Sequence, residues 1–358
     1  MKYQILTGDN RQTLKTLADN SIDAIVTDPP YGIDFLGKAW DANTGALETY
    51  QECLRVLKPG GHIVAFSAAR TYHHLAITLE QAGFEIRDQI MWIYSSGFPK
   101  SQDVGKSIDR TNKKKNRNDD SDSWQGWGTA LKPAHEPIAL ARKPLKVSIA
   151  KNVQKWGTGA LNIDACRVEF AEDDDPNATF AGGGTNWHQA ITQEDTAVRA
   201  TLEDRKAFSS DQGRFPSNVI GEIADGYQKY FYCPKVSRRE RHTGFEDPGP
   251  RHPGADGGGY QVHNVNDAVI VKGQGDQSGN NHPTVKPVEL MKYLIKLVTP
   301  KGGIVLDPFN GSGSTGMAAV ELGHEYVGCE LDPNYVEIAK KRIEAWNKKD
   351  TNFQELFE

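Results

Sequence analysis

Short apolar runs alternate with amphipathic runs in the first and last parts of the chain. Residues at 3–7, 22–27, 62–66, 84–94, 136–143, 304–306 and 326–330 form the apolar runs. Their length and β-branched content predict strands, most of them buried on both faces. Helical spacing of apolar residues predicts helices at 11–18, 47–57, 72–81 and 315–322. This alternation predicts an α/β fold with a doubly wound, mostly parallel sheet.

The middle of the chain has a different pattern. Residues 170–280 carry acidic runs, clustered glycines and few apolar runs, which is typical of a loop-rich insert. We therefore divide the chain into residues 1–150, an insert at 151–280, a second α/β part at 281–348 and a polar tail at 349–358. The first and third parts are expected to build one sheet together.

Length and composition limit the function. The 358 residues suffice for one large α/β domain and an insert. No apolar run approaches the roughly 18 residues that span a bilayer, and the first residues lack a secretory signal. The four cysteines lie far apart without a C-x-x-C pair, so we expect no metal site, no disulfide framework and a cytoplasmic protein. The net charge of −5 means that any nucleic-acid surface must be local.

The tetrapeptide Asp28-Pro29-Pro30-Tyr31 follows the apolar run at 22–27. Two prolines stop a strand or helix and leave backbone carbonyls without local partners. An exocyclic amine of a nucleobase is a poor nucleophile, because its lone pair is delocalised into the ring. The Asp28 carboxylate and the Pro29 carbonyl can accept its two N–H bonds, while the Tyr31 ring stacks on the base. The alternative is an ordinary strand followed by a proline-rich turn.

A second apolar strand ends in Asp307 and leads into Gly311, Gly313 and Gly316, which have G-x-G-x-x-G spacing. A predicted helix and another strand follow, and that strand ends in Glu330. This order is typical of a nucleotide-binding unit, in which glycines allow close approach of a ligand and the acid accepts bonds from ribose hydroxyls. An acid before the glycines favours a positively charged methionine group over a pyrophosphate.

Three motifs in this order, DPPY at 28–31, HPTVKP at 282–287 and DPFNGSGSTG at 307–316, resemble those of the DNA amino-methyltransferases. More narrowly, they resemble the permuted β class, in which DPPY precedes the cofactor motif. The resemblance covers roughly residues 1–150 and 280–346. It implies a Rossmann-like methyltransferase sheet, S-adenosyl-L-methionine as the cofactor and double-stranded DNA as the substrate. The Asp of DPPY is typical of the N6-adenine enzymes of this family, which act on a flipped-out base.

The resemblance assigns roles to residues of this chain. Asp28, Pro29, Pro30 and Tyr31 are the implied catalytic residues. Glu330 would hold the cofactor ribose, Asp9 the adenine region, and Thr284 and Lys286 match the motif flanking the cofactor carboxylate. The full set of implied cofactor-binding residues is Asp9, Thr284, Lys286, Asp307, Phe309, Gly311, Gly313 and Glu330. Open alternatives are a helix cap for Asp9, a helix start for Lys286 and a core position for Phe309.

Contacts with DNA are predicted in two places. The basic run of Lys113, Lys114, Lys115 and Arg117 lies near Trp124 and Trp127. Basic residues with nearby aromatics suit phosphate contacts, although a solvated loop is the alternative. By elimination, target recognition is expected in 151–280, with help from 100–130. A cognate restriction enzyme and a homodimer stay open.

Other functions remain to be separated from N6-adenine methylation. An N4-cytosine DNA methyltransferase uses the same arrangement, and an RNA methyltransferase is a further alternative. A nicotinamide-dependent oxidoreductase would use the glycine motif but leaves DPPY without a role. A catalytically inactive DNA-binding protein would not need Asp28 and Tyr31.

Overall fold

The computed structural model describes residues 3–33, 43–94, 101–169, 213–221, 238–245, 279–280, 282 and 284–354. Within this part of the chain, an eight-stranded sheet has the order β1-β8-β7-β2-β3-β5-β4-β6. Neighbouring strands run parallel except that β5 is antiparallel to both β3 and β4. The strands are β1 (Tyr3–Thr7), β2 (Ile22–Thr27), β3 (Leu57–Phe66), β4 (Glu85–Ile93), β5 (His135–Arg142), β6 (Val219–Gly221), β7 (Ile304–Asp307) and β8 (Glu325–Glu330).

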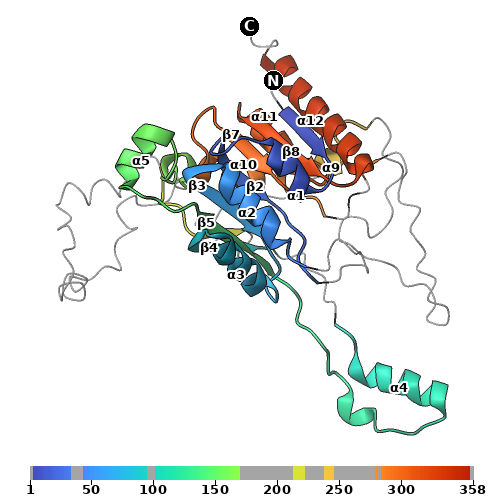
Figure 1. Ribbon diagram of the computed structural model, residues 1–358. Coiled ribbons are helices and arrows are strands. Elements are labelled where there is room, and N and C mark those ends of the chain that lie inside the picture. The colour runs from blue at the N-terminus through green and yellow to red at the C-terminus, as the bar shows by residue number, and fades with distance from the viewer. Residues whose placement is uncertain are drawn as a thin grey trace, which may run out of the picture.

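Helices cover both faces of this sheet (Figure 1). One apolar cluster joins α2 and α3 to the sheet through residues such as Tyr50 and Leu79. The other cluster joins α10 and α11 to the opposite face through residues such as Leu294 and Met317. The longer helices are α2 (Leu47–Val56), α3 (Tyr72–Ala82), α4 (Val104–Lys115), α5 (Ile149–Trp156), α10 (Val288–Val298), α11 (Ser314–Glu321) and α12 (Pro333–Gln354). The predicted doubly wound, mostly parallel α/β fold is confirmed.

The two distant parts of the chain interleave in this sheet. β1 pairs with β8, and β2 pairs with β7, so N-terminal and C-terminal strands lie side by side (Figure 1). All six residues of β2 are buried, which explains why its apolar residues Ile22, Ala24, Ile25 and Val26 do not alternate with solvent-facing polar residues. As expected, one sheet is built from both ends of the chain.

Several elements differ from the predictions, and α5, α10 and α12 were not individually predicted. The helix expected at 11–18 is a short α1 (Asn10–Thr13) followed by a 3-10 turn, η1 (Leu14–Thr16). β3 begins at Leu57, directly after α2 and ahead of the predicted strand start at 62, and its pairing with β2 shifts register between Ile22 and Ala24. The polar region 95–136 contains α4, which the sequence analysis did not predict.

Parts of the insert pack on the sheet. β6 adds to β4 as an edge strand, and the 3-10 turn η5 (Asp164–Cys166) places Cys166 in the cluster under α10. A short helix, α9 (Arg238–Arg241), contributes Glu240, whose Oε1 accepts a hydrogen bond from the backbone N–H of Val288 at 2.6 Å. The predicted boundaries at 151 and 280 stay predictions, and most of 170–280 lies outside the described residues.

No helix among the described residues has the length and apolar character to cross a membrane. Within the same part of the chain, no group of three or more His, Cys, Asp or Glu side chains is arranged to hold a metal ion.

Candidate active site at the carboxyl rim of the sheet

Four acidic side chains lie at one edge of the sheet, which we call the carboxyl rim. Asp9 follows β1, Glu330 ends β8, Asp307 ends β7 and Asp28 follows β2. These strands are consecutive neighbours in the sheet and all run parallel. The carboxyl ends of parallel strands meet at the same edge, where ligands of open α/β sheets bind. The four acids therefore lie at one edge of the sheet.

The antiparallel strand β5 brings a fifth acid to this rim. Since β5 runs opposite to β3, its amino end lies at the edge where the parallel strands have their carboxyl ends. Glu136 is the second residue of β5. The sequence analysis gave Glu136 no role, and its place at the rim follows only from the strand direction.

The side chains of Asp28, Tyr31, Glu136 and Lys286 form a connected polar cluster. The Tyr31 hydroxyl lies 2.9 Å from Asp28 Oδ1 and 2.6 Å from Glu136 Oε2. Lys286 Nζ lies 2.6 Å from Asp28 Oδ2 and 3.6 Å from Glu136 Oε2. One ammonium thus neutralises part of the charge of two carboxylates, which is required where like charges meet in a partly buried site.

Lys286 reaches this cluster between two aromatic rings. Its Nζ is 5.0 Å from the centroid of Phe66 and 5.4 Å from that of Tyr31, within the range of cation–π attraction. Lys286 is only 7% exposed. Burial lowers the pKa of Lys286, but the two carboxylates outweigh burial, and the net shift is upward. Lys286 therefore stays charged and holds Asp28 in place.

Tyr31 is held by the same charges. Its pKa is raised well above 10, first by burial and then by the Asp28 and Glu136 carboxylates. The hydroxyl therefore keeps its hydrogen at neutral pH. The ring lies against the apolar cluster on the α10 side of the sheet.

Asp307 is buried, and its carboxylate is used inside the protein. Its Oδ1 accepts from the Thr27 hydroxyl at 2.7 Å and from the backbone N–H of Phe309 at 3.0 Å, and its Oδ2 accepts from the Thr315 hydroxyl at 2.7 Å. Burial raises the pKa of Asp307 to about 6, although these three hydrogen bonds oppose that shift. Asp307 thus ties the ends of β2, β7 and α11 together.

The glycine turn after β7 approaches its neighbours closely. Gly311 has φ +51°, and a Cβ there would lie 2.9 Å from His282 Nε2. Gly313 has φ +80° and forms the N-cap of α11, a conformation that favours glycine. Glu330 faces this turn, because its Oε2 accepts from the backbone N–H of Gly311 at 2.8 Å. Its pKa is raised, chiefly by burial.

The remaining predicted cofactor residues lie around this turn. Asp9 caps α1 by accepting from the backbone N–H of Arg11 and also pairs with the Arg11 guanidinium at 2.5 Å, so the alternative of a helix cap is present. Phe309 is partly buried and packs near Tyr50, with ring centroids 6.3 Å apart. Thr284 is exposed, and its carbonyl lies 2.7 Å from His282 Nδ1.

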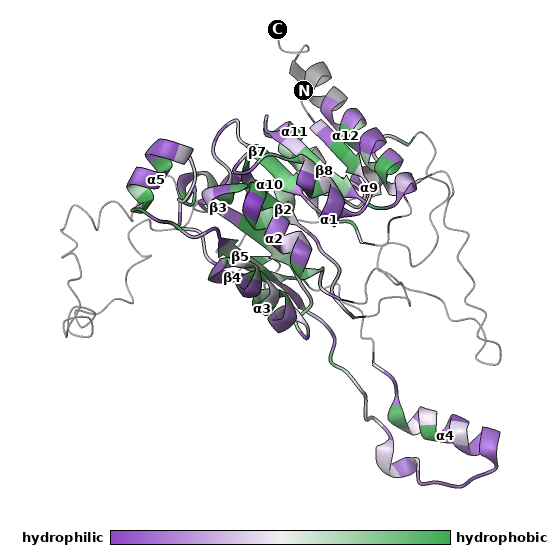
Figure 2. Ribbon diagram, in the orientation of Figure 1, coloured by the Kyte–Doolittle hydropathy of each residue, from purple (hydrophilic) through white to green (hydrophobic). Residues whose placement is uncertain are grey.

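The predicted DNA-binding residues lie on a separate segment, residues 101–134, which we call the arm. Figure 1 shows α4 of the arm standing away from the sheet, and Figure 2 shows it as largely hydrophilic. Lys113, Lys114 and Lys115 form the last turn of α4, and all are exposed. Positive charge is favourable at a helix C-terminus. The rings of Trp124 and Trp127 meet edge to face with centroids 5.4 Å apart, and both are exposed.

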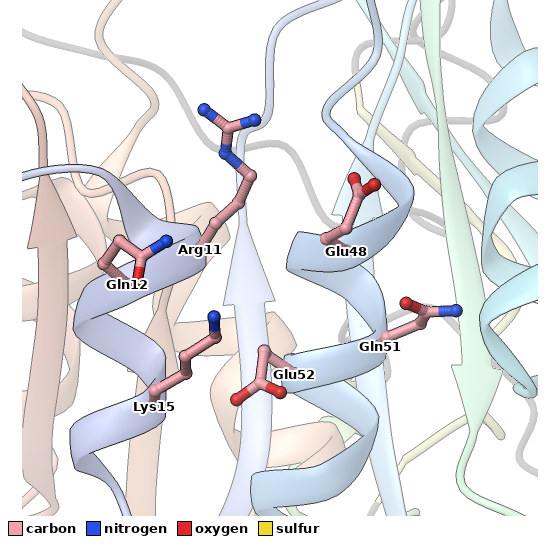
Figure 3. Close-up of a pocket in the computed structure, with 6 residues that line it drawn as sticks. All are labelled: Arg11, Gln12, Lys15, Glu48, Gln51 and Glu52. Atoms are coloured by element: carbon pink, nitrogen blue, oxygen red, sulfur yellow. The ribbon is translucent and has the colours of Figure 1, made fainter.

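An open pocket lies between α1 and α2, and none of the four implied catalytic residues lines it. Figure 3 shows one wall from α1 and η1, with Arg11, Gln12 and Lys15, and the opposite wall from α2, with Glu48, Gln51 and Glu52. The six lining residues are all polar. Ligand sites of small molecules are mostly apolar with few polar groups, so this pocket is a surface depression between charged helices.

Sequence reasoning missed Thr27, Thr315, Tyr94 and Arg342 in addition to Glu136. Arg342 is fully buried under the glycine turn and donates from Nη1 to the Ser312 carbonyl at 2.6 Å. A charged residue in a helical pattern normally predicts a solvent face, which hid Arg342. For Glu136 the only signal was an acid at the start of an apolar strand.

Comparisons with known proteins relate nearly the whole chain to DNA methylases. The family model N6_N4_Mtase, described as DNA methylase, matches residues 22–341. Type II methyltransferase M.HindIII of Haemophilus influenzae is 26% identical, over 95% of this chain and 94% of that protein. DNA adenine methyltransferase YhdJ of Escherichia coli is 24% identical, over 95% and 82%. The solved M1.HpyAVI–SAM complex is 18% identical, with TM-score 0.45, over 95% of this chain and 98% of that one.

Proposed function

The chain belongs to the N6_N4_Mtase family of DNA methylases, and from that premise we propose that it transfers a methyl group from S-adenosyl-L-methionine to N6 of an adenine in DNA. The observation that carries this proposal is the Asp28–Tyr31 pair held by Lys286 at the carboxyl rim, one strand away from the glycine turn. The names of relatives such as DNA adenine methyltransferase YhdJ favour adenine. The family model also covers N4 enzymes, so cytosine is the second candidate.

The charges at the rim fit a cationic methyl donor. S-adenosyl-L-methionine, when bound, supplies a methyl group activated by a sulfonium. Asp28, Asp307, Glu330 and Glu136 lie at the rim with Lys286 as the cation between two of them. Each carboxylate oxygen of Glu330 accepts one backbone N–H and keeps acceptor capacity for a ribose hydroxyl. We propose Asp9, Thr284, Asp307, Phe309, Gly311, Gly313 and Glu330 as the surroundings of the donor.

Lys286 is proposed to act beside Asp28, on the side of the site that binds the target base. Its ammonium pairs with Asp28 rather than pointing to a free position. The prediction that Lys286 flanks the cofactor carboxylate therefore has a competing interpretation, in which Lys286 fixes the Asp28 carboxylate. The pH dependence and the cofactor affinity of a Lys286 variant distinguish these interpretations.

The residues of this chain would work mainly by positioning. Asp28 Oδ1 and the Pro29 carbonyl accept the two N6–H bonds, which localises the lone pair on N6. Tyr31 stacks on the base after the base has left the duplex. Pro29 and Pro30 fix the turn that presents these groups. Proximity, orientation and preorganised acceptors then supply the rate enhancement.

Double-stranded DNA is proposed to contact the arm through Lys113, Lys114, Lys115 and Arg117. These four side chains are exposed at and just after the C-terminal end of α4, which suits phosphate contacts. The exposed Trp124–Trp127 pair lies on the same arm and offers rings for stacking. A cytoplasmic location, a cognate restriction enzyme, a homodimer and target recognition by 151–280 stay predictions.

Transfer of a labelled methyl group tests this function. The purified chain is incubated with labelled S-adenosyl-L-methionine and, separately, with unmethylated duplex DNA, RNA or no nucleic acid. The proposal expects label in the DNA alone. Label in RNA alone would contradict the DNA substrate, and binding of NAD in place of S-adenosyl-L-methionine would contradict the methyl-transfer function.

A further inference from the structure

Glu136 takes part in a hydrogen-bonded chain that starts at the predicted base-binding carboxylate. Asp28 Oδ1, the Tyr31 hydroxyl and Glu136 Oε2 follow one another at 2.9 Å and 2.6 Å. The side chains of Asp28 and Glu136 are 19% and 20% exposed, so Glu136 can exchange a proton with solvent. The proposed chemistry gives Asp28 a role, but it gives none to Glu136.

The hydrogen-bonded chain of Asp28, Tyr31 and Glu136 contains fewer hydrogens than short oxygen–oxygen contacts. A tyrosine hydroxyl carries one hydrogen, and an ionised carboxylate carries none. Two oxygen–oxygen contacts below 3 Å each need a hydrogen between them. When both carboxylates are ionised, one contact lacks a hydrogen, and uptake of one proton completes both hydrogen bonds.

Three polar side chains face the Glu136 carboxylate. The groups that face it are Tyr31 from the turn after β2, Tyr94 from the end of β4 with its hydroxyl 3.4 Å from Oε1, and Lys286 from the turn before α10. Lys286 is closer to Asp28, at 2.6 Å, than to Glu136, at 3.6 Å. The ammonium therefore attracts the Asp28 carboxylate more strongly, which leaves Glu136 as the more weakly paired end of the hydrogen-bonded chain.

We propose that Glu136 is a positioning residue that receives, through Tyr31, the proton that N6 of the target base loses. This inference rests on the proposed function. When N6 bonds to the methyl group, the sulfur–methyl bond of the donor breaks and its electron pair stays on sulfur, so N6 is left positively charged with one hydrogen too many. That N6–H bond breaks, and the proton passes to Asp28 Oδ1. The Tyr31 hydroxyl gives its hydrogen to Glu136 Oε2 and takes the proton from Asp28. Asp28 and Tyr31 return to their starting forms, and Glu136 releases the proton to solvent.

Single-turnover methylation by three variants tests the proposed proton path through Tyr31 to Glu136. Glu136→Gln keeps the size and an acceptor oxygen but cannot take a proton, and Tyr31→Phe keeps the ring but removes the link. Each is expected to slow the methyl-transfer step by about 10- to 100-fold, with unchanged cofactor affinity. The double variant is expected to be no slower than the slower single variant, because the residues act as one unit. Glu337→Gln, at an exposed position of α12, is the matched control and should keep the wild-type rate.

A second measurement uses the free protein. Infrared difference spectra between about pH 5 and pH 8 follow the carboxylic-acid C=O band of a protonated Glu or Asp. A band that is present in the wild type and altered in both Glu136→Gln and Tyr31→Phe supports the shared proton.

Three results would overturn the inference: a Glu136→Gln rate equal to the wild type, multiplicative losses in the double variant, or identical infrared spectra. Failure of the proposed function is a separate result, because the wild-type protein would then make no N6-methyladenine. The infrared experiment would still test the shared proton of Asp28, Tyr31 and Glu136.

Discussion

The carboxyl rim and the arm both carry clusters of charge, but in opposite settings. At the rim, Lys286 and Asp307 are 7% and 2% exposed. Lys286 donates a hydrogen bond to Asp28, and Asp307 accepts one from Thr315. On the arm, Lys113, Lys114 and Lys115 are exposed and sit on a helix away from the sheet (Figure 1). Buried charges act in a low dielectric and depend on each partner. Exposed charges act weakly and one by one, and salt screens them.

Because of this difference, the rim and the arm are expected to have separate roles. The rim is expected to set the rate of methyl transfer and its pH dependence, and a single substitution there should have a large effect. The arm is expected to set DNA affinity and its salt dependence, and only combined substitutions there should have a clear effect.

The largest effect is expected for Asp28→Ala. It removes the acceptor that localises the N6 lone pair and leaves Lys286 with Glu136 as its remaining acidic contact in the cluster. Methyl transfer in a single turnover should fall by about 1,000-fold, while cofactor binding stays intact. Glu80→Ala, which replaces an exposed acid on α3, is the control. Full activity of Asp28→Ala would remove the assignment.

Lys286→Met should have the next largest effect. Without the ammonium, the repulsion between the Asp28 and Glu136 carboxylates is no longer offset by Lys286. The rate should fall by about 10- to 100-fold, and the acid limb of the pH–rate profile should move to higher pH. A loss of cofactor affinity with an unshifted profile would instead place Lys286 at the cofactor carboxylate.

On the arm, Lys113, Lys114, Lys115 and Arg117 are replaced together by Gln. DNA affinity at low salt should fall by about tenfold, and the slope of log K against log salt should shrink by roughly one for each charge that contacts phosphate. The rate at saturating DNA should not change. Lys301→Gln is the control, because Lys301 is exposed in the turn before β7, at the opposite edge of the sheet. An unchanged salt slope would separate the arm from DNA binding.

Asp307→Asn should have the smallest effect, and it concerns stability. The pKa of Asp307 is about 6 in the fold and about 3.8 ordinarily, so the folded state binds this proton more tightly than the unfolded state. Its stabilisation is complete below pH 3.8 and is lost as pH rises through 6. From about pH 5 to pH 7.5, the stability of Asp307→Asn relative to the wild type should therefore rise by about 1 kcal/mol.

Urea unfolding at the two pH values measures this difference. A constant difference between the two proteins would mean that Asp307 keeps an ordinary pKa in the fold. The arm variant described above serves as the comparison, because its exposed charges should leave the unfolding free energy nearly unchanged at both pH values.

More of the rim than of the arm could be predicted from the sequence. Short apolar strands that end in an acid have a clear pattern, so β2, β7 and β8 and the meeting of Asp28, Asp307 and Glu330 were predictable. The pattern does not encode which strand is antiparallel, and so Glu136 was missed. Helix α4 was missed because it buries only Gly105, and a helix without an apolar face gives no periodic signal.

The central claim is that the rim methylates N6 of adenine in DNA. The most direct test is nucleoside mass spectrometry of unmethylated genomic DNA after incubation with the wild-type chain and labelled S-adenosyl-L-methionine. The account predicts labelled N6-methyladenine as the product, and its near absence with Asp28→Ala. Labelled N4-methylcytosine would contradict the base, and no methylated nucleoside despite cofactor binding would contradict the claim itself.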